Sequence, residues 1–199
     1  TSAIVAAGLP VNTNVVGATV ITYDVRDVAY NAADTVVRTV TVADTTQPYV
    51  KTVQALSAHT VRIEYSKIMG TGVLTPGNYT VSGTGRGALS ASPSTVTFIE
   101  PGKYLLTWNC PGIMKNGGDI TVTVNAAVRD EYGNLMTNPV KRTHTGGAIA
   151  ALPVISLLGG NPVNIECKNN YVEPGATAVD ACGGDLSGSI TVGGDVVNT

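Results

Sequence analysis

The chain has 199 residues and a formal net charge of −2, with 43% hydrophobic, 5% aromatic and only 13% charged residues. So small a net charge provides no field with which to hold nucleic acid or an anionic membrane, and no apolar run reaches the roughly 18 residues needed to span a bilayer. The composition is rich in Gly, Thr, Val, Asn and Ala, which is typical of secreted all-β proteins.

Apolar and polar residues alternate with a period of two along most of the chain, and no long segment carries the apolar stripe of a helix. Turn signals such as Pro76-Gly77 and Pro101-Gly102 separate the alternating runs. The alternation predicts half-buried strands at residues 15–26, 36–42, 60–65, 79–82, 95–99, 103–108, 120–124, 154–157, 163–167 and 189–192. Short strands at this spacing predict an all-β fold built from β-sandwiches.

Two linkers divide the chain. Asp44-Thr45-Thr46-Gln47-Pro48 separates one strand from the next, and residues 146–153 are small and poor in charge. Residues 47–147 are therefore predicted to form one complete sandwich, flanked by residues 1–46 and 148–199. About 100 residues is an ordinary size for such a domain.

The two flanking segments resemble complementary parts of one domain. PVISLLGGNPVNIEC, YVEPGATAVDAC and GDLSGSITVGG, within residues 153–194, resemble the opening of a bacterial Ig-like surface repeat, akin to hyalin-type repeats and to Ig-like domains of a pesticidal crystal protein. VVGATVITYDVRDVAYNAADTVVRTVTVADTTQP resembles the close of the same repeat, with departures at Ala18 and Tyr30. The middle segment more loosely resembles another bacterial Ig-like class, through NYTVSG and the turn formed by Asp130, Gly133 and Asn134.

This resemblance implies Ig-like sandwiches in tandem, one complete and flanked by two complementary half-domains. Joining both halves within one chain would strain the linkers, because the first and last strands of a sandwich end at opposite poles. We therefore expect copies to associate head to tail, each junction completing one sandwich by strand complementation. Two alternatives stay open: the chain is one period of a long repetitive polypeptide, or its ends fall within two neighbouring repeats. The residues predicted to form the junction are Val16, Val20, Tyr23, Val36 and Val40 on one side, and Val163, Ile165, Ile190 and Val192 on the other.

Three cysteines are present. Cys167 and Cys182 lie 15 residues apart in one half-domain, so we expect them to form a disulfide across two neighbouring strands, which indicates an oxidising, extracellular location. Cys110 is left over, either as a buried thiol or as an intermolecular link.

Acidic residues in turns are candidate Ca²⁺ ligands, because this ion prefers oxygen donors and often stiffens joints between extracellular domains. Capping of the turns by the same side chains is the alternative interpretation. Asn78 begins an Asn-Tyr-Thr acceptor pattern for N-glycosylation. The candidate Ca²⁺ ligands are Asp24 and Asp27 with Asn31, Asp44 at the linker, Asp130 with Asn134, and Asp180 with Asp185.

The sequence carries no recognisable catalytic constellation. Its two histidines, His59 and His144, have no metal-ligating or nucleophilic partner at motif spacing and are expected on the surface, with His144 in an exposed tail strand. Trp108 and Tyr104 lie on one face of a predicted strand, either as core residues or as a platform for glycans. We expect a non-enzymatic structural subunit of a cell-surface filament, sheath or fibrous adhesin, whose partners are copies of itself. The alternative is an adhesion or carbohydrate-binding module that binds surface glycans.

Overall fold

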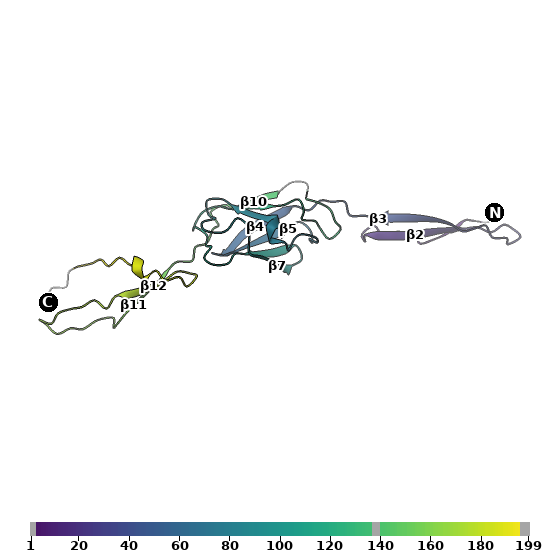
Figure 1. Ribbon diagram of the computed structural model, residues 1–199. Helices are drawn as coiled ribbons and strands as arrows, with labels where there is room; N and C mark the ends of the chain where they lie inside the picture. Colours follow the sequence, from purple (N-terminus) through teal and green to yellow (C-terminus); the bar gives the residue numbers. More distant parts are fainter. Residues whose placement is uncertain (1–2, 137–139, 196–199) are drawn as a thin grey trace. The chain divides into compact units, whose positions relative to one another are not determined.

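The computed structural model describes residues 3–136 and 140–195 (Figure 1). Within this part every regular element is a β-strand or a 3₁₀ turn, which confirms the predicted all-β class. No helix among the described residues is long and apolar enough to cross a membrane. The chain divides into two compact units, Thr1–Thr46 and Gln47–Thr199, and this division coincides with the first predicted linker.

The N-terminal unit is a single antiparallel sheet of three strands in the order β1-β2-β3. Its strands are β1 (Val5–Ala7), β2 (Gly17–Asp24) and β3 (Val36–Val42). Alternation predicts β2 and β3, whereas β1 has only three residues and is too short to show a period. Ile21 is the one buried hydrophobic residue among the described residues of this unit, so the sheet has almost no core of its own.

The second unit contains a sandwich of two sheets, ordered β4-β5-β8-β7 and β10-β9-β6. Numbered within the sandwich, these orders are 1-2-5-4 and 7-6-3, which is the topology of a constant-type immunoglobulin domain. Figure 1 labels β4, β5, β7 and β10 of this sandwich. A 3₁₀ turn, η1 (Pro76–Asn78), leads into β6. The strands are β4 (Val50–Ser57), β5 (Thr60–Tyr65), β6 (Tyr79–Ser82), β7 (Thr95–Glu100), β8 (Lys103–Thr107), β9 (Ile120–Val124) and β10 (Val140–His144).

Alternate residues of both sheets enclose one hydrophobic core. The indole of Trp108 is 3% exposed and its Nε1–H donates to the Ser90 carbonyl oxygen at 2.9 Å, so Trp108 fills the core as the first of its two interpretations requires. The side chain of Tyr104 is equally buried, at 2%, and the strand therefore offers no glycan platform. The core residues without any exposure are Val50, Val61, Ile63, Leu106, Tyr79, Ile120, Val122, Val124 and Val128.

The structure corrects the prediction for His144, which lies in β10 and not in a tail strand. β10 pairs with β9 along its whole length, and His144 stands opposite Ile120. The His144 Nδ1 atom accepts a hydrogen bond from the Ala55 backbone N–H at 3.2 Å. Most side chains of this strand are charged or carry a hydroxyl group. The strand therefore lacks the alternation of apolar residues on which the sequence prediction is based.

After the sandwich, residues 148–195 form only a two-stranded sheet, β11 (Val154–Leu157) with β12 (Ala176–Val179), and a 3₁₀ turn, η2 (Ser187–Ser189). The strands predicted at residues 163–167 and 189–192 are wrong for this chain. Residues 166–169 make a turn closed by the Asn169 N–H and the Glu166 carbonyl oxygen at 3.1 Å, and η2 takes up the start of the second range. A strand needs a neighbour to pair with its backbone, and these two segments have none among the described residues.

Truncating a buried leucine side chain tests where the hydrophobic core of the sandwich lies. We expect Leu106→Ala, at a fully buried site, to lower the free energy of unfolding by about 2–5 kcal/mol. Leu74→Ala, at a side chain that is 54% exposed, should change it by less than about 0.5 kcal/mol. Denaturant unfolding followed by the fluorescence of the single Trp measures both. Equal losses from the two variants would contradict the assigned core.

Candidate functional site

The face of the N-terminal sheet that contains Ile21 and Tyr23 carries its largest hydrophobic side chains. The register pairs Tyr23 with Val36 and Thr19 with Val40, and residues directly opposite in an antiparallel pair point to the same face. The Arg38 guanidinium carbon lies 5.8 Å from the centroid of the Tyr23 ring and so belongs to this face as well. We call Ile21, Tyr23, Val36, Val40 and Val42 the N-terminal apolar face.

Of the residues predicted for the junction, Tyr23, Val36 and Val40 share this face, and Val36 is 64% exposed. Val20 lies on the opposite face, where it stands across from Thr39. Val16 precedes β2 and is 39% exposed. The period of two along a strand means that a residue one position away points to the other face, so Val20 and Tyr23 cannot both contact a partner that covers a single face.

The C-terminal segment encloses an open hollow of about 950 Å³. Val163, Ile165 and Val192, all predicted for the junction, line this hollow together with Leu157 of β11. Ile190 is not among its lining residues and caps the end of η2. We call this depression the C-terminal hollow. Its hydrophobic side chains are Leu157, Leu158, Val163, Ile165, Val172 and Val192, with exposed fractions from 43% to 81%.

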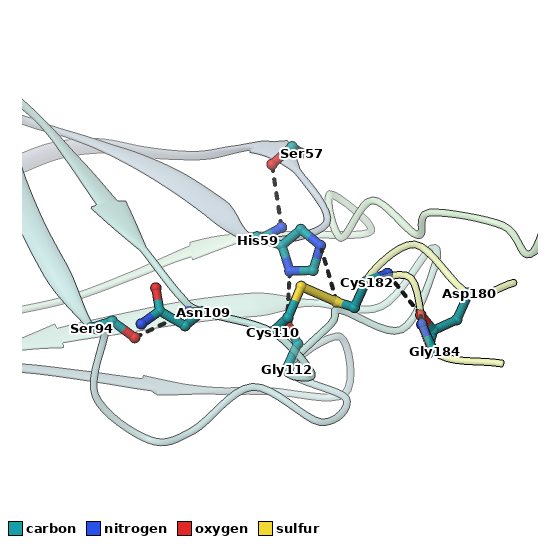
Figure 2. The surroundings of a disulfide bond; sticks show 9 residues. All are labelled: Ser57, His59, Ser94, Asn109, Cys110, Gly112, Asp180, Cys182 and Gly184. Carbon is teal, nitrogen blue, oxygen red and sulfur yellow. Dashed lines mark hydrogen bonds between the residues drawn. A yellow bond between two sulfur atoms is a disulfide. The ribbon is translucent and has the colours of Figure 1, made fainter.

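The disulfide differs from the predicted one. Cys182 pairs with Cys110, with Cα atoms 5.6 Å apart, and Cys167 is a free, exposed thiol (Figure 2). The prediction placed Cys167 on a strand beside its partner, and that strand is not formed here. The observed bridge joins residues 72 positions apart, and a loop of that length gives a stabilisation of roughly 4 kcal/mol in the chain-entropy model.

His59 lies against this disulfide and is half-buried, which corrects its assignment to the surface (Figure 2). Its Nδ1 atom is 2.7 Å from the Gly112 carbonyl oxygen, and since a carbonyl only accepts, Nδ1 carries the proton. In the neutral ring the Nε2 lone pair is therefore free, and Nε2 is 3.9 Å from the Cys182 Sγ. No motif links residues 59, 110 and 182 in the sequence, so this cluster was not predictable from spacing.

The ligand atoms of His59, Cys110 and Cys182 lie within 4.8 Å of one another. Imidazole and thiolate are a donor set that suits zinc. The two sulfur atoms are bonded to each other, however, and a disulfide offers no thiolate to a metal. The cluster is better described as a disulfide with an adjacent acid–base group.

Most of the candidate Ca²⁺ ligands cap turns, in agreement with the alternative interpretation. In three loops an aspartate Oδ1 accepts a hydrogen bond from the backbone N–H four residues later, and the aspartate N–H returns a bond to the carbonyl oxygen of that same residue. This loop recurs in both units and closes a tight turn. The bonds to Oδ1 are Asn31 N to Asp27 at 2.9 Å, Asn134 N to Asp130 at 2.8 Å, and Gly184 N to Asp180 at 2.7 Å.

The other candidate carboxylates also accept hydrogen bonds, two of them from the backbone two residues ahead. Asp44 accepts one from the Thr46 N–H at 2.9 Å, and Asp185 accepts one from the Ser187 N–H at 2.8 Å. Asp24 accepts one from the Thr35 hydroxyl at 2.5 Å. These contacts account for the positions of the side chains without an ion.

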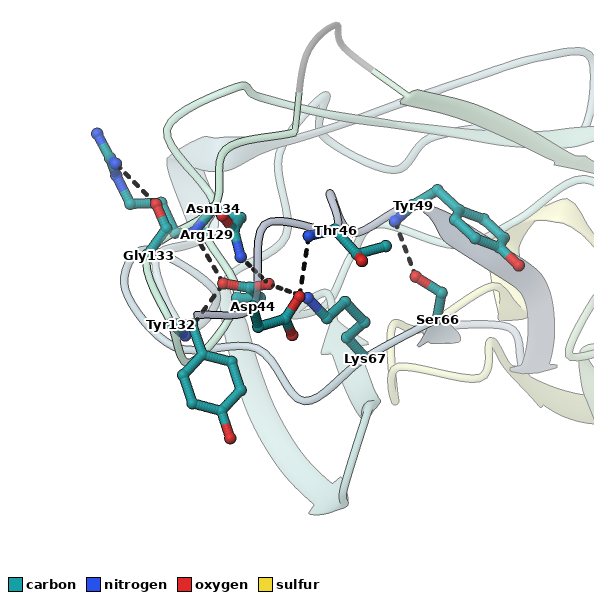
Figure 3. A network of polar contacts seen from close by, with 10 residues as sticks. Asp44, Thr46, Tyr49, Ser66, Lys67, Arg129, Tyr132, Gly133 and Asn134 are labelled. Carbon is teal, nitrogen blue, oxygen red and sulfur yellow. Dashed lines mark hydrogen bonds and ion pairs between the residues drawn. The ribbon is translucent and has the colours of Figure 1, made fainter. Parts of the chain in front are cut away.

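Asp130 has an additional partner, the ammonium group of Lys67. The Lys67 Nζ is 2.5 Å from the Asp130 Oδ2, and the side chain of Asp130 is fully buried. The Asn134 Nδ2 donates to the same oxygen at 3.0 Å. Figure 3 shows the side chains of Lys67 and Asn134 pointing toward each other in this network. Burial acts to raise the pKa of Asp130, but the hydrogen bonds from Lys67 and Asn134 outweigh it, and the net pKa is lowered.

Asn78, the predicted glycosylation acceptor, is half-buried at the end of η1. Its Nδ2 donates to the Gly72 carbonyl oxygen at 2.8 Å. Its glycosylation stays a prediction.

No family model matches the sequence, and no curated protein matches it. Among solved structures, the chain is similar to the N-terminal part of the bacterial S-layer protein SbsC, with 18% identity over 71% of this chain and 32% of that one, and a TM-score of 0.43. The S-layer protein rSbsC(31-844) gives 18% identity, coverage of 71% and 19%, and a TM-score of 0.43. The chain thus spans a third or less of these proteins, and a likeness at this level assigns it no function.

Replacing Asp130 tests the buried ion pair. A carboxyl whose pKa is lowered in the folded state stabilises the fold above its unfolded pKa of about 3.9, and this contribution is lost as the pH falls. We expect Asp130→Asn to cost about 1–3 kcal/mol at neutral pH, because Lys67 loses its charged partner. The stability of the variant should also fall less steeply than that of the native chain between about pH 5 and pH 2.

The matched control is Glu131→Gln, at the exposed neighbouring position, which should keep the native stability at neutral pH. Urea unfolding at a series of pH values gives both quantities. An Asp130→Asn variant with the native acid profile would show that the pair does not govern acid stability.

Proposed function

We propose that this protein is a structural subunit of an extracellular, cell-surface assembly in which copies join head to tail. The N-terminal apolar face of one copy fills the C-terminal hollow of the next, and the two segments complete one Ig-like sandwich. The observation that carries this proposal is the pair of small sheets, of three and two strands, each of which leaves large apolar side chains exposed. The role is structural and involves no catalysis.

Neither small sheet has a core of its own. Ile21 is the one buried hydrophobic residue in the described part of the first sheet, and Ala178 is its counterpart in residues 154–195. Sheets of two or three strands are marginally stable without a second layer, and contiguous apolar surface of this kind marks an interaction site. Both sheets therefore need a partner that supplies apolar side chains.

A second copy of the chain is the partner that we propose. The C-terminal segment resembles the opening, and the N-terminal segment the close, of the same kind of surface repeat, and together they amount to about 90 residues, one ordinary domain. Each also presents unpaired strand edges to which a neighbour can add strands. Because the two surfaces lie at different places on the chain, the contact is heterologous, and it generates an open filament when its rotation does not close into a ring.

The disulfide supports the proposed extracellular location. The bond between Cys110 and Cys182 forms and persists in oxidising compartments such as the cell exterior. The low share of charged residues, 13%, and the net charge of −2 give no reason to expect a nucleic acid as partner. The glycan-binding alternative loses its main support, because Trp108 and Tyr104 are buried in the sandwich core.

Charge substitutions on the two surfaces test the junction. We expect Val36→Asp and Leu157→Asp each to abolish filament growth, because each would bury an unpaired carboxylate. Val37→Asp and Val154→Asp are matched controls that should assemble normally, since both lie on the opposite faces of the same strands. The exposed fractions agree closely, at 64% and 60% for Val36 and Val37 and at 61% and 60% for Leu157 and Val154.

Mixing the two defective variants distinguishes a head-to-tail junction from other contacts. Each variant retains one intact surface, so an equimolar mixture should yield a heterodimer and nothing larger. Analytical ultracentrifugation of each variant alone and of the mixture measures this. A mixture that contains nothing larger than monomers would contradict the proposed junction. Control variants that also do not assemble would contradict it as well.

A further inference from the structure

We infer that the Cys110–Cys182 disulfide is a thiol–disulfide exchange site whose incoming thiol is Cys167 of the same chain and whose acid–base group is His59. In the free chain Cys182 is paired with Cys110. When a neighbouring copy fills the C-terminal hollow, Cys167 displaces Cys110, and the bond moves into the completed sandwich. This inference rests on the proposed function and adds a covalent step to it.

The stoichiometry of the sulfur atoms permits this step without an oxidant. The chain contains three cysteines, one disulfide and one exposed thiol. Exchange proceeds by attack of a thiolate on a disulfide sulfur and conserves the number of disulfides. Cys167 and Cys182 are only 15 residues apart in one chain, so the attack is intramolecular and does not depend on the chain concentration.

His59 is placed to move the proton that the exchange requires. Its protonated Nδ1 is held by the Gly112 carbonyl oxygen at 2.7 Å, its Nε2 lies 3.9 Å from the Cys182 Sγ, and a ring nitrogen of His59 lies within 4.8 Å of the Cys110 Sγ. Nε2 accepts the proton of the Cys167 thiol, and the Cys167 thiolate attacks the Cys182 Sγ. The bond between Cys182 and Cys110 breaks, its electron pair leaves with the Cys110 Sγ, and His59 returns the proton to that sulfur.

The turn around Cys167 explains why filling of the hollow triggers the exchange. Lys168, the next residue, has φ of +72°, a left-handed conformation that costs energy for a residue with a side chain. Ile165, two residues before Cys167, lines the hollow. Packing Ile165 against a neighbour's sheet favours an extended backbone here, which removes the left-handed residue and carries Cys167 toward β12.

The test is a map of the cysteines in free and assembled material. The native chain is separated into a dilute soluble fraction and a pelleted assembled fraction, quenched with acid, and labelled with N-ethylmaleimide before non-reducing peptide mapping. We expect the free chain to carry the label on Cys167 and the assembled chain to carry it on Cys110, with a peptide that links Cys167 to Cys182. Assembled chains that keep the Cys110–Cys182 bond, or that link separate copies, would overturn the exchange and leave the proposed function standing.

Failure to obtain any assembled fraction would overturn the proposed function, and the exchange with it, so the two failures are distinguishable. The role of His59 is tested by His59→Gln, which should slow the exchange at least tenfold at an equal degree of assembly, with partial rescue by imidazole in the buffer. His144→Gln is the control, because that ring bonds to the Ala55 amide and not to sulfur. Native exchange rates in His59→Gln would remove His59 from the step.

Discussion

The organisation of this protein depends on one constraint: apolar side chains on one face of a sheet must be buried, and a small sheet cannot bury them alone. The central sandwich satisfies the constraint internally, because its sheets of four and three strands enclose one core. The sheets on either side of it in the sequence have the same alternation of residues but lack a second layer. Burial of roughly 25 cal/mol per Å² of apolar surface is the dominant favourable term in folding and association, so a surface left exposed in one copy provides the driving force to bind another.

The cysteines and His59 connect this constraint to covalent chemistry. Cys182 lies in an aspartate-capped loop, where its N–H donates to the Asp180 Oδ1 at 2.8 Å, and its disulfide with Cys110 ties this loop to the central sandwich. Cys167 lies in a turn at the margin of the C-terminal hollow. An event that reorganises the hollow therefore acts on one thiol and leaves the other sulfur atoms and His59 in position.

Local patterns predicted the parts of the fold that depend on near neighbours in the sequence. β3, β5, β6, β9 and β11 have the predicted bounds, because β-branched alternation and flanking turns are properties of a few consecutive residues. The loops that start at Asp27, Asp130 and Asp180 also follow from local spacing, since a carboxylate reaches the backbone four residues ahead.

The features that depend on distant residues could not be predicted in this way. Residues 163–167 alternate as a strand should, but strand formation also requires a partner that residues 3–136 and 140–195 do not place beside them. The pairing of Cys182 with Cys110 and the contact of His59 with Gly112 arise from tertiary packing. Val20 illustrates a further limit of the sequence prediction. Alternation assigns the residues of β2 to two faces, but it does not say which face a partner covers.

Hydrogen–deuterium exchange as a function of protein concentration tests most directly whether the small sheets are completed by another copy. The amides of β9, which are paired on both sides within the sandwich, serve as an internal reference. If copies complete one another, the amides of β3 and of β11 exchange rapidly in dilute solution and become strongly protected as the concentration rises, while β9 stays unchanged. If sedimentation shows that the material is assembled but the exchange rates of the β3 and β11 amides do not change with protein concentration, the shared sandwich is contradicted.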